Sequence, residues 1–182
     1  MPHLPTMPRR TWLERSSLAI AVLLIGVGVT VLMGWWLRID AIIQPFGAGA
    51  AIKANDAVCV LLLGAVFLTI ELGLVGTAWL ALVPAAIAAL SLAENIFNVD
   101  LFIDEILVTD HLLAETADPG RMSAMSSACI LLVSLVLAWR AFSRGARARL
   151  FAEAVVSSIP ASAGFSTLLG YAASLPAVYR WG

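Results

Sequence analysis

Five long apolar runs dominate this sequence and restrict what it can fold into. The first, SLAIAVLLIGVGVTVLMGWW (17–36), contains no charged side chain. A helix of about 20 apolar residues spans the hydrocarbon core of a bilayer. The five runs lie at 17–36, 57–74, 77–93, 123–139 and 154–175. They predict an all-α fold, a polytopic bundle of about five transmembrane helices.

The composition agrees with this fold. The chain is 61% hydrophobic and 13% charged, whereas a soluble domain has about 45–50% apolar and about 25% charged residues. Arg9, Arg10 and Arg15 precede the first run as in a signal peptide. The run is too long for a signal sequence and has no A-x-A cleavage site after it. We therefore expect a retained first span, preceded by a cytoplasmic tail at 1–16.

Few residue types suited to catalysis or cofactor binding are present. Cys59 and Cys129 lie inside apolar runs, which favours small core residues over a disulfide. His3 and His111 are the only histidines, so paired histidine ligands for haem inside helices are excluded. Phosphate loops, zinc motifs and nucleophile elbows are absent from the sequence. We predict that this chain is not an enzyme and holds no cofactor or metal.

The basic residues predict the topology. Of the eleven Lys and Arg residues, seven lie before the first run or between the fourth and fifth runs. These seven are Arg9, Arg10, Arg15, Arg140, Arg144, Arg147 and Arg149. Short cytoplasmic loops carry an excess of Lys and Arg. We therefore expect the N-terminus in the cytoplasm and the C-terminus outside.

The segment between the third and fourth runs, on the side predicted to face outward, is rich in acidic residues. From Glu94 to Arg121 there are seven carboxylates and a single Arg. Within VDLFIDEILVTDHLLAETADPGRM (99–122), apolar residues follow the helical spacing i, i+3, i+4, i+7, i+8. This pattern predicts an amphipathic helix over 99–113 that lies in the outer membrane interface. Asp-Pro-Gly at 118–120 ends it. Outward-facing amphipathic connectors of this kind complete the predicted bundle.

Four carboxylates are candidates for sensing or coupling: Glu94, Asp100, Asp104 and Glu105. Glu94 ends the third run, and an ionisable group at membrane depth favours a functional role. The alternative is an end cap that snorkels into the interface. Asp100 and Asp104 are four residues apart on the predicted helix and could share a divalent cation. The alternative is a lid over the bundle whose acidic face is only solvated.

The sequence also repeats. Two pairs of segments align: GWWLRIDAI (34–42) with ENIFNVDLF (94–102), and IKANDAVCVLLLG (52–64) with MSAMSSACILLVS (122–134). Asp40 then matches Asp100, and Cys59 matches Cys129. The unit is a hairpin: an outward span, an interfacial segment and a return span.

A third copy of this hairpin begins and is incomplete. GYAASLPAV (170–178) falls where an outward span ends, and no return span follows it before residue 182. A complete third hairpin would make six spans. We therefore expect this sequence to be a fragment or a truncated reading frame.

These motifs resemble a known family. ENIFNVDLFIDEIL and PGRMSAMSSACILL resemble the "G-I-D-x-L-L" and "P-G-R-M-S-P-N-T-A" segments of the N-terminal multi-span sensor regions of bacterial histidine kinases and diguanylate cyclases. The likeness covers most of 17–182. The usual Asn-Thr of that motif is replaced by Asn55-Asp56 in the first copy and by Met125-Ser126 in the second.

The resemblance implies a sensory input region for bacterial signal transduction, in the inner membrane of a bacterium. Its output domain, a kinase or cyclase, would lie beyond this chain. The expected partners are the lipid bilayer and a cytoplasmic output domain or signalling partner; a homodimer stays open, and nucleic acid is not expected. The alternatives are a small transporter or channel component, or a structural subunit of a membrane complex. A transporter would favour ionisable residues near the middle of several spans.

Overall fold

The computed structural model describes residues 12–45, 51–74, 78–112, 119–142 and 146–173. Its described residues form helices and no strand. The elements are α1 (Trp12–Leu37), α2 (Asp40–Ile43), α3 (Ala54–Glu71), the 3-10 helix η1 (Ala78–Ala81), α4 (Leu82–Phe97), α5 (Ala124–Phe142) and α6 (Ala146–Ala172). The predicted all-α fold is confirmed for this part of the chain.

Three segments are long and apolar enough to cross a membrane. They are Ser16–Leu37 in α1, Ala54–Glu71 in α3, and Trp79–Phe97, which joins η1 to α4. A shorter apolar helix covers Ala124–Trp139 within α5. Each of the five predicted runs coincides with a long helix, while a count of five spans stays a prediction.

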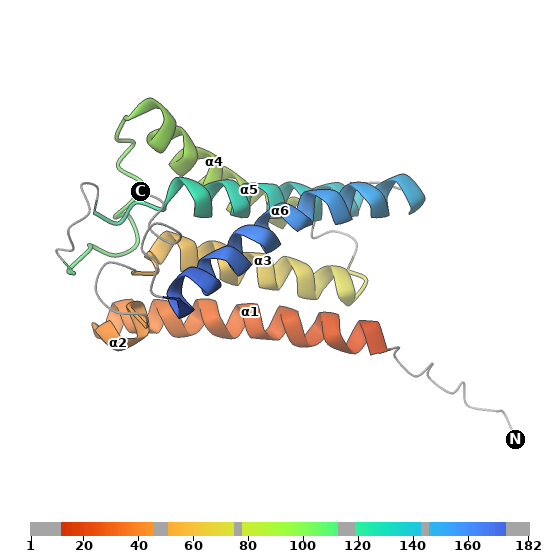
Figure 1. Cartoon of the computed structure of the whole chain (residues 1–182), viewed down its shortest axis with the longest axis horizontal. Coiled ribbons are helices and arrows are strands. Elements are labelled where there is room, and N and C mark those ends of the chain that lie inside the picture. Colours follow the sequence, from red (N-terminus) through yellow and green to blue (C-terminus); the bar gives the residue numbers. More distant parts are fainter. Residues whose placement is uncertain (1–11, 46–50, 75–77, 113–118, 143–145, 174–182) are drawn as a thin grey trace, which may run out of the picture.

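The helices run back and forth along the long axis of the molecule (Figure 1). α1 packs mainly against α3, α4 against α5, and α5 against α6. The α1–α3 and α4–α5 connectors therefore lie at the same end of the bundle (Figure 1). The described part of the α3–η1 turn lies at the other end. This arrangement brings two segments that are distant in sequence, 38–53 and 98–123, next to each other.

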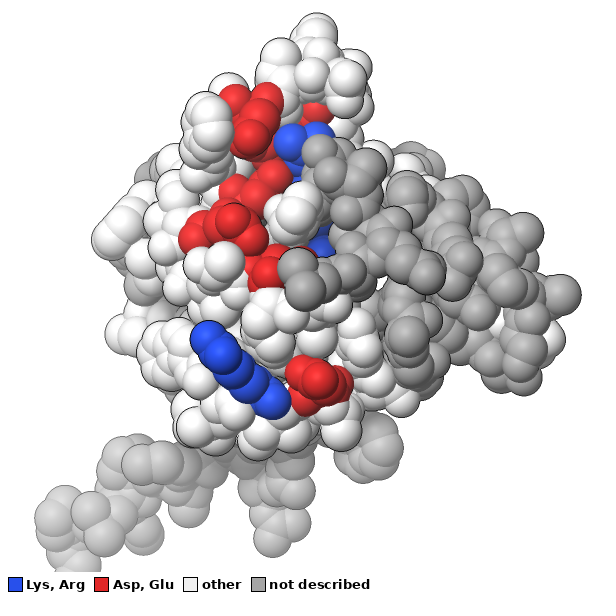
Figure 2. Space-filling model, turned by 90° about the vertical axis from the view of Figure 1, so that its left-hand side faces the viewer, with Lys and Arg blue, Asp and Glu red and all other residues white. Residues whose placement is uncertain are grey.

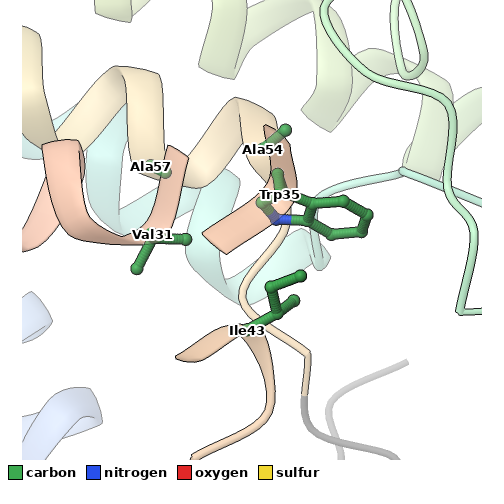
Figure 3. Packing of buried hydrophobic residues seen from close by; sticks show 5 residues of the cluster. All are labelled: Val31, Trp35, Ile43, Ala54 and Ala57. Carbon is green, nitrogen blue, oxygen red and sulfur yellow. The ribbon is translucent and has the colours of Figure 1, made fainter. Parts of the chain in front are cut away.

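A small apolar cluster anchors the first connector to α1 and α3. Val31, Trp35, Ile43, Ala54 and Ala57 are all buried. Figure 3 shows the Trp35 ring at the end of α1, with Ile43 of the connector below it and Ala54 of α3 above it. Among the described residues of this connector, only α2, a single turn, is helical. Its apolar side chains cover the end of the hairpin.

α1 and α4 are each followed by a residue in the left-handed conformation. Arg38 follows α1 with a φ of 55°, and Asn98 follows α4 with a φ of 50°. These two positions are equivalent in the aligned segments 34–42 and 94–102. A left-handed residue is a common way to end a helix, because it turns the chain away and lets the last carbonyls find partners.

The helix predicted over 99–113 is wrong. α4 ends at Phe97, and the described residues from 98 to 112 form turns and bends. The periodicity is real, but the carboxylates of this stretch accept hydrogen bonds from nearby backbone N–H groups, as detailed below. Short acidic side chains that bond the backbone locally compete with helix formation. The segment is therefore an irregular loop rather than an amphipathic helix.

Candidate functional site

The α4–α5 connector, residues 98–123, is folded by its own carboxylates. The Asp100 carboxylate accepts a hydrogen bond from the backbone N–H of Phe102 at 2.8 Å, and Glu105 accepts one from Asp110 at 2.9 Å. The Asp110 carboxylate accepts two more, from Leu112 and Gly120, both at 3.0 Å. Each bond fixes one turn of the loop. The acidity of this segment thus has a direct structural role.

Glu94 and Asp104 form the buried centre of the site. Glu94 is 0% exposed and Asp104 is 7% exposed. Glu94 lies in the last turn of α4, and its Oε1 accepts a hydrogen bond from Leu101 N at 2.8 Å. The Glu94 and Asp104 carboxyl groups lie within hydrogen-bonding range of each other. Each also has one buried oxygen with no hydrogen-bond partner, Oε2 of Glu94 and Oδ1 of Asp104.

Arg121 supplies the positive charge at this centre. Its Nε donates to Asp104 Oδ2 at 3.0 Å, and the side chains of this ion pair are 9% and 8% exposed. Its Nη2 donates to the Val99 carbonyl at 3.3 Å. Arg121 therefore ties the end of the connector to its beginning. A pocket of about 170 Å³ opens beside it and is lined by Asp100, Phe102, Asp104, Glu105, Pro119 and Arg121.

A second ion pair joins the connector to the first hairpin. Lys53 Nζ lies 2.8 Å from Asp110 Oδ2, and the two side chains are only 9% and 3% exposed. Burial acts to raise the pKa of Asp110, but hydrogen bonds from Lys53 and from the backbone N–H groups of Leu112 and Gly120 outweigh it and lower that pKa. Asp110 is therefore an ionised partner for Lys53 at neutral pH.

Further polar contacts fasten the connector to α1 and α3. Asn55 Nδ2 donates to the carbonyls of Ile103 at 3.2 Å and Asp104 at 3.4 Å. The Trp35 ring meets the His111 ring edge-on, with centroids 5.3 Å apart. His111 also lies 3.3 Å from the exposed Asp40 carboxylate. Side chains of the first hairpin thus hold the connector of the second.

The four predicted candidates have different places in this site. Glu94 and Asp104 are brought together, whereas Asp100 and Glu105 are exposed and line the adjacent pocket. The possibility that Asp100 and Asp104 share a cation rests on helical spacing that the loop does not have. Within the described ranges, no three His, Cys, Asp or Glu side chains gather as metal ligands.

Three central residues were missed at the level of sequence: Lys53, Asp110 and Arg121. A signal for two of them was present. Lys53 is the only lysine in the sequence, and both Lys53 and Arg121 lie on the side predicted to face outward. A basic residue against the charge bias of its side needs a partner. Figure 2 shows acidic side chains running across this end of the bundle, with basic groups set among them.

The fold and the site together define a class: a helical bundle with apolar, membrane-length helices and a polar cluster at one end. Comparison with protein-family models, with curated proteins and with solved structures gives no match for this chain. The site must therefore be interpreted from its own chemistry. It can bind a proton or a small cation at the buried carboxyl groups, and it can couple the two hairpins mechanically.

Proposed function

We propose that this chain is the membrane-embedded input region of a bacterial signal-transduction protein. It has about five spans, lies in the inner membrane with its N-terminus in the cytoplasm, and acts on a cytoplasmic output domain or partner. The α4–α5 connector on the outer side receives the stimulus, and the helices carry the change in packing to the inner side.

One observation carries the proposal: the connector that buries the Asp104 and Asp110 carboxyl groups is bonded to elements of both hairpins, and Lys53 of the first hairpin pairs with Asp110. Glu94 belongs to α4, Asp104 to the connector, and Asn55 of α3 bonds the Asp104 carbonyl. A change in charge here must move the connector relative to both helices, because buried charges without partners are costly. Such a junction is suited to sensing.

The transporter alternative is less favoured by the placement of charge. The described charged side chains of α3 and α4 lie in terminal turns, at Asp56, Glu71 and Glu94. A transport pathway places ionisable groups near the middle of several spans. Charged side chains at the ends of the helices suit a receptor that detects its stimulus at one face of the membrane.

Hydrogen exchange in liposomes tests the proposal without an identified output domain. We would reconstitute the chain and change the pH, and separately the Na⁺ and Ca²⁺ concentrations, on the connector side. Exchange is then followed in peptides from the far end, 66–74 and 78–84. We expect at least one of these changes to alter exchange there, and the quadruple variant Glu94→Gln, Asp100→Asn, Asp104→Asn, Glu105→Gln to abolish the response.

Three results would contradict the proposal. The first is a far end that responds to none of these changes. The second is ion flux across the same liposomes, which would indicate a transporter. The third is stoichiometric copurification with a membrane partner that the quadruple variant leaves intact, which would indicate a structural subunit.

A further inference from the structure

The Glu94 and Asp104 carboxyl groups pose a problem of hydrogen bonding. Each accepts one bond, Glu94 from Leu101 N and Asp104 from Arg121. Each keeps one buried oxygen without a partner, although the two groups lie within hydrogen-bonding range of each other. Ionised carboxylates only accept hydrogen bonds, so two of them cannot bond to each other. A single proton placed between them would supply the missing donor.

The charges around the pair pose a second problem. Arg121 is the basic residue that acts on Glu94, and it bonds Asp104 directly. Lys53, directly before α3, is bonded to Asp110, and the partly buried Asp56 in the first turn of α3 lies near Lys53. The described side chains of α5 and η1 include no Lys, Arg, Asp or Glu. Two carboxylates and one guanidinium therefore leave one uncompensated negative charge in a buried site.

Other acidic groups add to this excess and do not relieve it. Asp100 and Glu105 lie in the same connector and line the pocket beside Asp104 and Arg121. His111 contacts Asp40 and Trp35 at the other side of the connector. A buried excess charge is neutralised far more readily than it is tolerated.

We propose that Glu94 and Asp104 form a proton-binding site, in which the two carboxyl groups share one proton beside Arg121. The shared proton supplies the missing hydrogen bond and brings the charge of the cluster to zero. A metal ion fits less well, because the described residues offer no third acidic, His or Cys ligand and Arg121 repels a cation.

Loss of this proton changes the packing of the connector. Two adjacent buried carboxylates repel each other, and Asp104 stays bonded to Arg121 while Glu94 belongs to α4. The connector then separates from the end of α4, and the bond from Leu101 N to Glu94 is lost. The idea that this proton is the stimulus rests on the proposed function. The existence of the proton site does not depend on it.

Glu94→Gln is the decisive variant. The glutamine amide can accept the bond from Leu101 and donate one to Asp104, so it reproduces the protonated pair without a titratable proton. Asp100→Asn is the matched control, since Asp100 is an exposed acid of the same connector and asparagine keeps an oxygen to accept the bond from Phe102.

Infrared spectroscopy of the protein in liposomes tests the proton directly. With metal ions chelated at neutral pH, we expect the carbonyl stretch of a hydrogen-bonded carboxylic acid. This band disappears at alkaline pH, is absent in Glu94→Gln, and is unchanged in Asp100→Asn. A spectrum at neutral pH that is identical in wild type and Glu94→Gln would overturn the proposal.

Hydrogen exchange at Leu101 tests the structural consequence. We expect the protection factor of this amide to fall about tenfold or more between neutral and alkaline pH in the wild type, because its acceptor moves away. Glu94→Gln keeps its protection throughout, while Asp100→Asn follows the wild type. If Na⁺ or Ca²⁺ restores protection at alkaline pH, the site binds a metal ion and the proposal fails.

The two ideas can fail separately. If the infrared band behaves as expected but hydrogen exchange at the far end of the bundle does not change, the proton site is supported and the sensory function is contradicted. If hydrogen exchange at the far end changes but the band is absent, the sensory function is supported and the proton site is contradicted.

Discussion

The two hairpins of the bundle share a topology but are packed differently. α1 and α3 come close through glycine: a Cβ on Gly28 would lie 2.6 Å from that of Leu61, and one on Gly64 would lie 2.9 Å from the backbone N of Ile25. In the second hairpin, Asn95 of α4 donates a hydrogen bond to the carbonyl of Met122, just before α5, at 3.1 Å. The first hairpin is closed by backbone proximity, and the second adds a polar contact to an apolar interface that includes Ala88 and Ile130.

Their connectors differ in the same sense. At position 34, Gly34 lies directly under α2, and a Cβ there would come within 2.8 Å of Ile42. At the aligned position 94, a glutamate carboxyl binds the backbone N–H of Leu101. At this position the first connector is therefore closed by apolar contact, which does not depend on pH or ions. The second is closed by charge, so its packing can respond to them.

The largest effect should come from breaking the bond between the hairpins. Lys53→Met leaves the Asp110 carboxylate buried without its cation, and we expect a loss of about 3–5 kcal/mol in unfolding free energy. Unfolding titrations in mixed micelles measure it. Arg38→Met, which removes an exposed cation from the first hairpin, serves as the control. Equal stability of the two variants would show that the ion pair does not join the hairpins.

The same ion pair should persist into acid. The pKa of Asp110 is lowered by folding from an unfolded value of about 3.9. Because folding lowers this pKa, the ion pair stabilises the protein fully at pH values above the pKa of Asp110 in the unfolded chain. The stabilisation is lost as the pH falls through the pKa of Asp110 in the folded protein. The difference in unfolding free energy between wild type and Asp110→Asn should therefore stay constant from pH 7 to about pH 5 and decline only at lower pH. A decline between pH 7 and pH 5 would contradict it.

Close packing in the first hairpin predicts a contrast between two glycines. The added methyl group of Gly28→Ala would overlap Leu61 and the Ala57 carbonyl, so we expect a loss of about 1–3 kcal/mol. Gly26 has nothing within 4 Å of such a methyl group, and Gly26→Ala should cost nothing. The same titrations compare the two variants, and equal costs would refute glycine-mediated packing.

Two adjacent tryptophans give a smaller contrast. Trp35 is 2% exposed and donates its indole N–H to the Ile52 carbonyl at 2.9 Å, while Trp36 is 71% exposed. Trp35→Phe should lose about 1 kcal/mol, mainly through the unpaired carbonyl. Trp36→Phe should be neutral. Equal stability of these variants would mean that this hydrogen bond does not secure the first connector.

The smallest effect concerns the two left-handed residues. A left-handed conformation costs an ordinary residue about 1–2 kcal/mol, whereas asparagine tolerates it better. Arg38→Gly removes that cost and adds about 0.4–1 kcal/mol of unfolded-chain entropy. It should therefore stabilise the protein by roughly 0.5 kcal/mol, and Asn98→Gly should not. A larger gain at Asn98 would contradict the comparison.

Much of the architecture follows from local pattern. Each apolar run is a helix, because a long stretch without charges can satisfy its backbone only internally when it leaves water. Pro160 lies inside α6, which continues through it, whereas Pro84 lies in the first turn of α4, where a proline is tolerated. The free cysteines Cys59 and Cys129 also agree with their expected place in the apolar runs.

The helix expected over 99–113 failed for a reason that periodicity does not contain. Apolar spacing reports which side chains could share a face, but it does not report which backbone groups the carboxylates will bind. Here Asp100, Glu105 and Asp110 bond backbone N–H groups two to ten residues away. These bonds replaced the helical ones.

By itself, the sequence determined an all-helical chain of apolar runs, an acidic segment between the third and fourth runs, and Glu94 as a polar group at the end of a run. Only the tertiary structure decided that Glu94 meets Asp104 and Arg121, and that Lys53 meets Asp110 across 57 residues. Helix periodicity relates residues that are only a few positions apart, so it can be recognised in a short stretch of sequence. Pairing between buried charges depends on which helix ends are packed together, and that is settled only when the whole bundle forms.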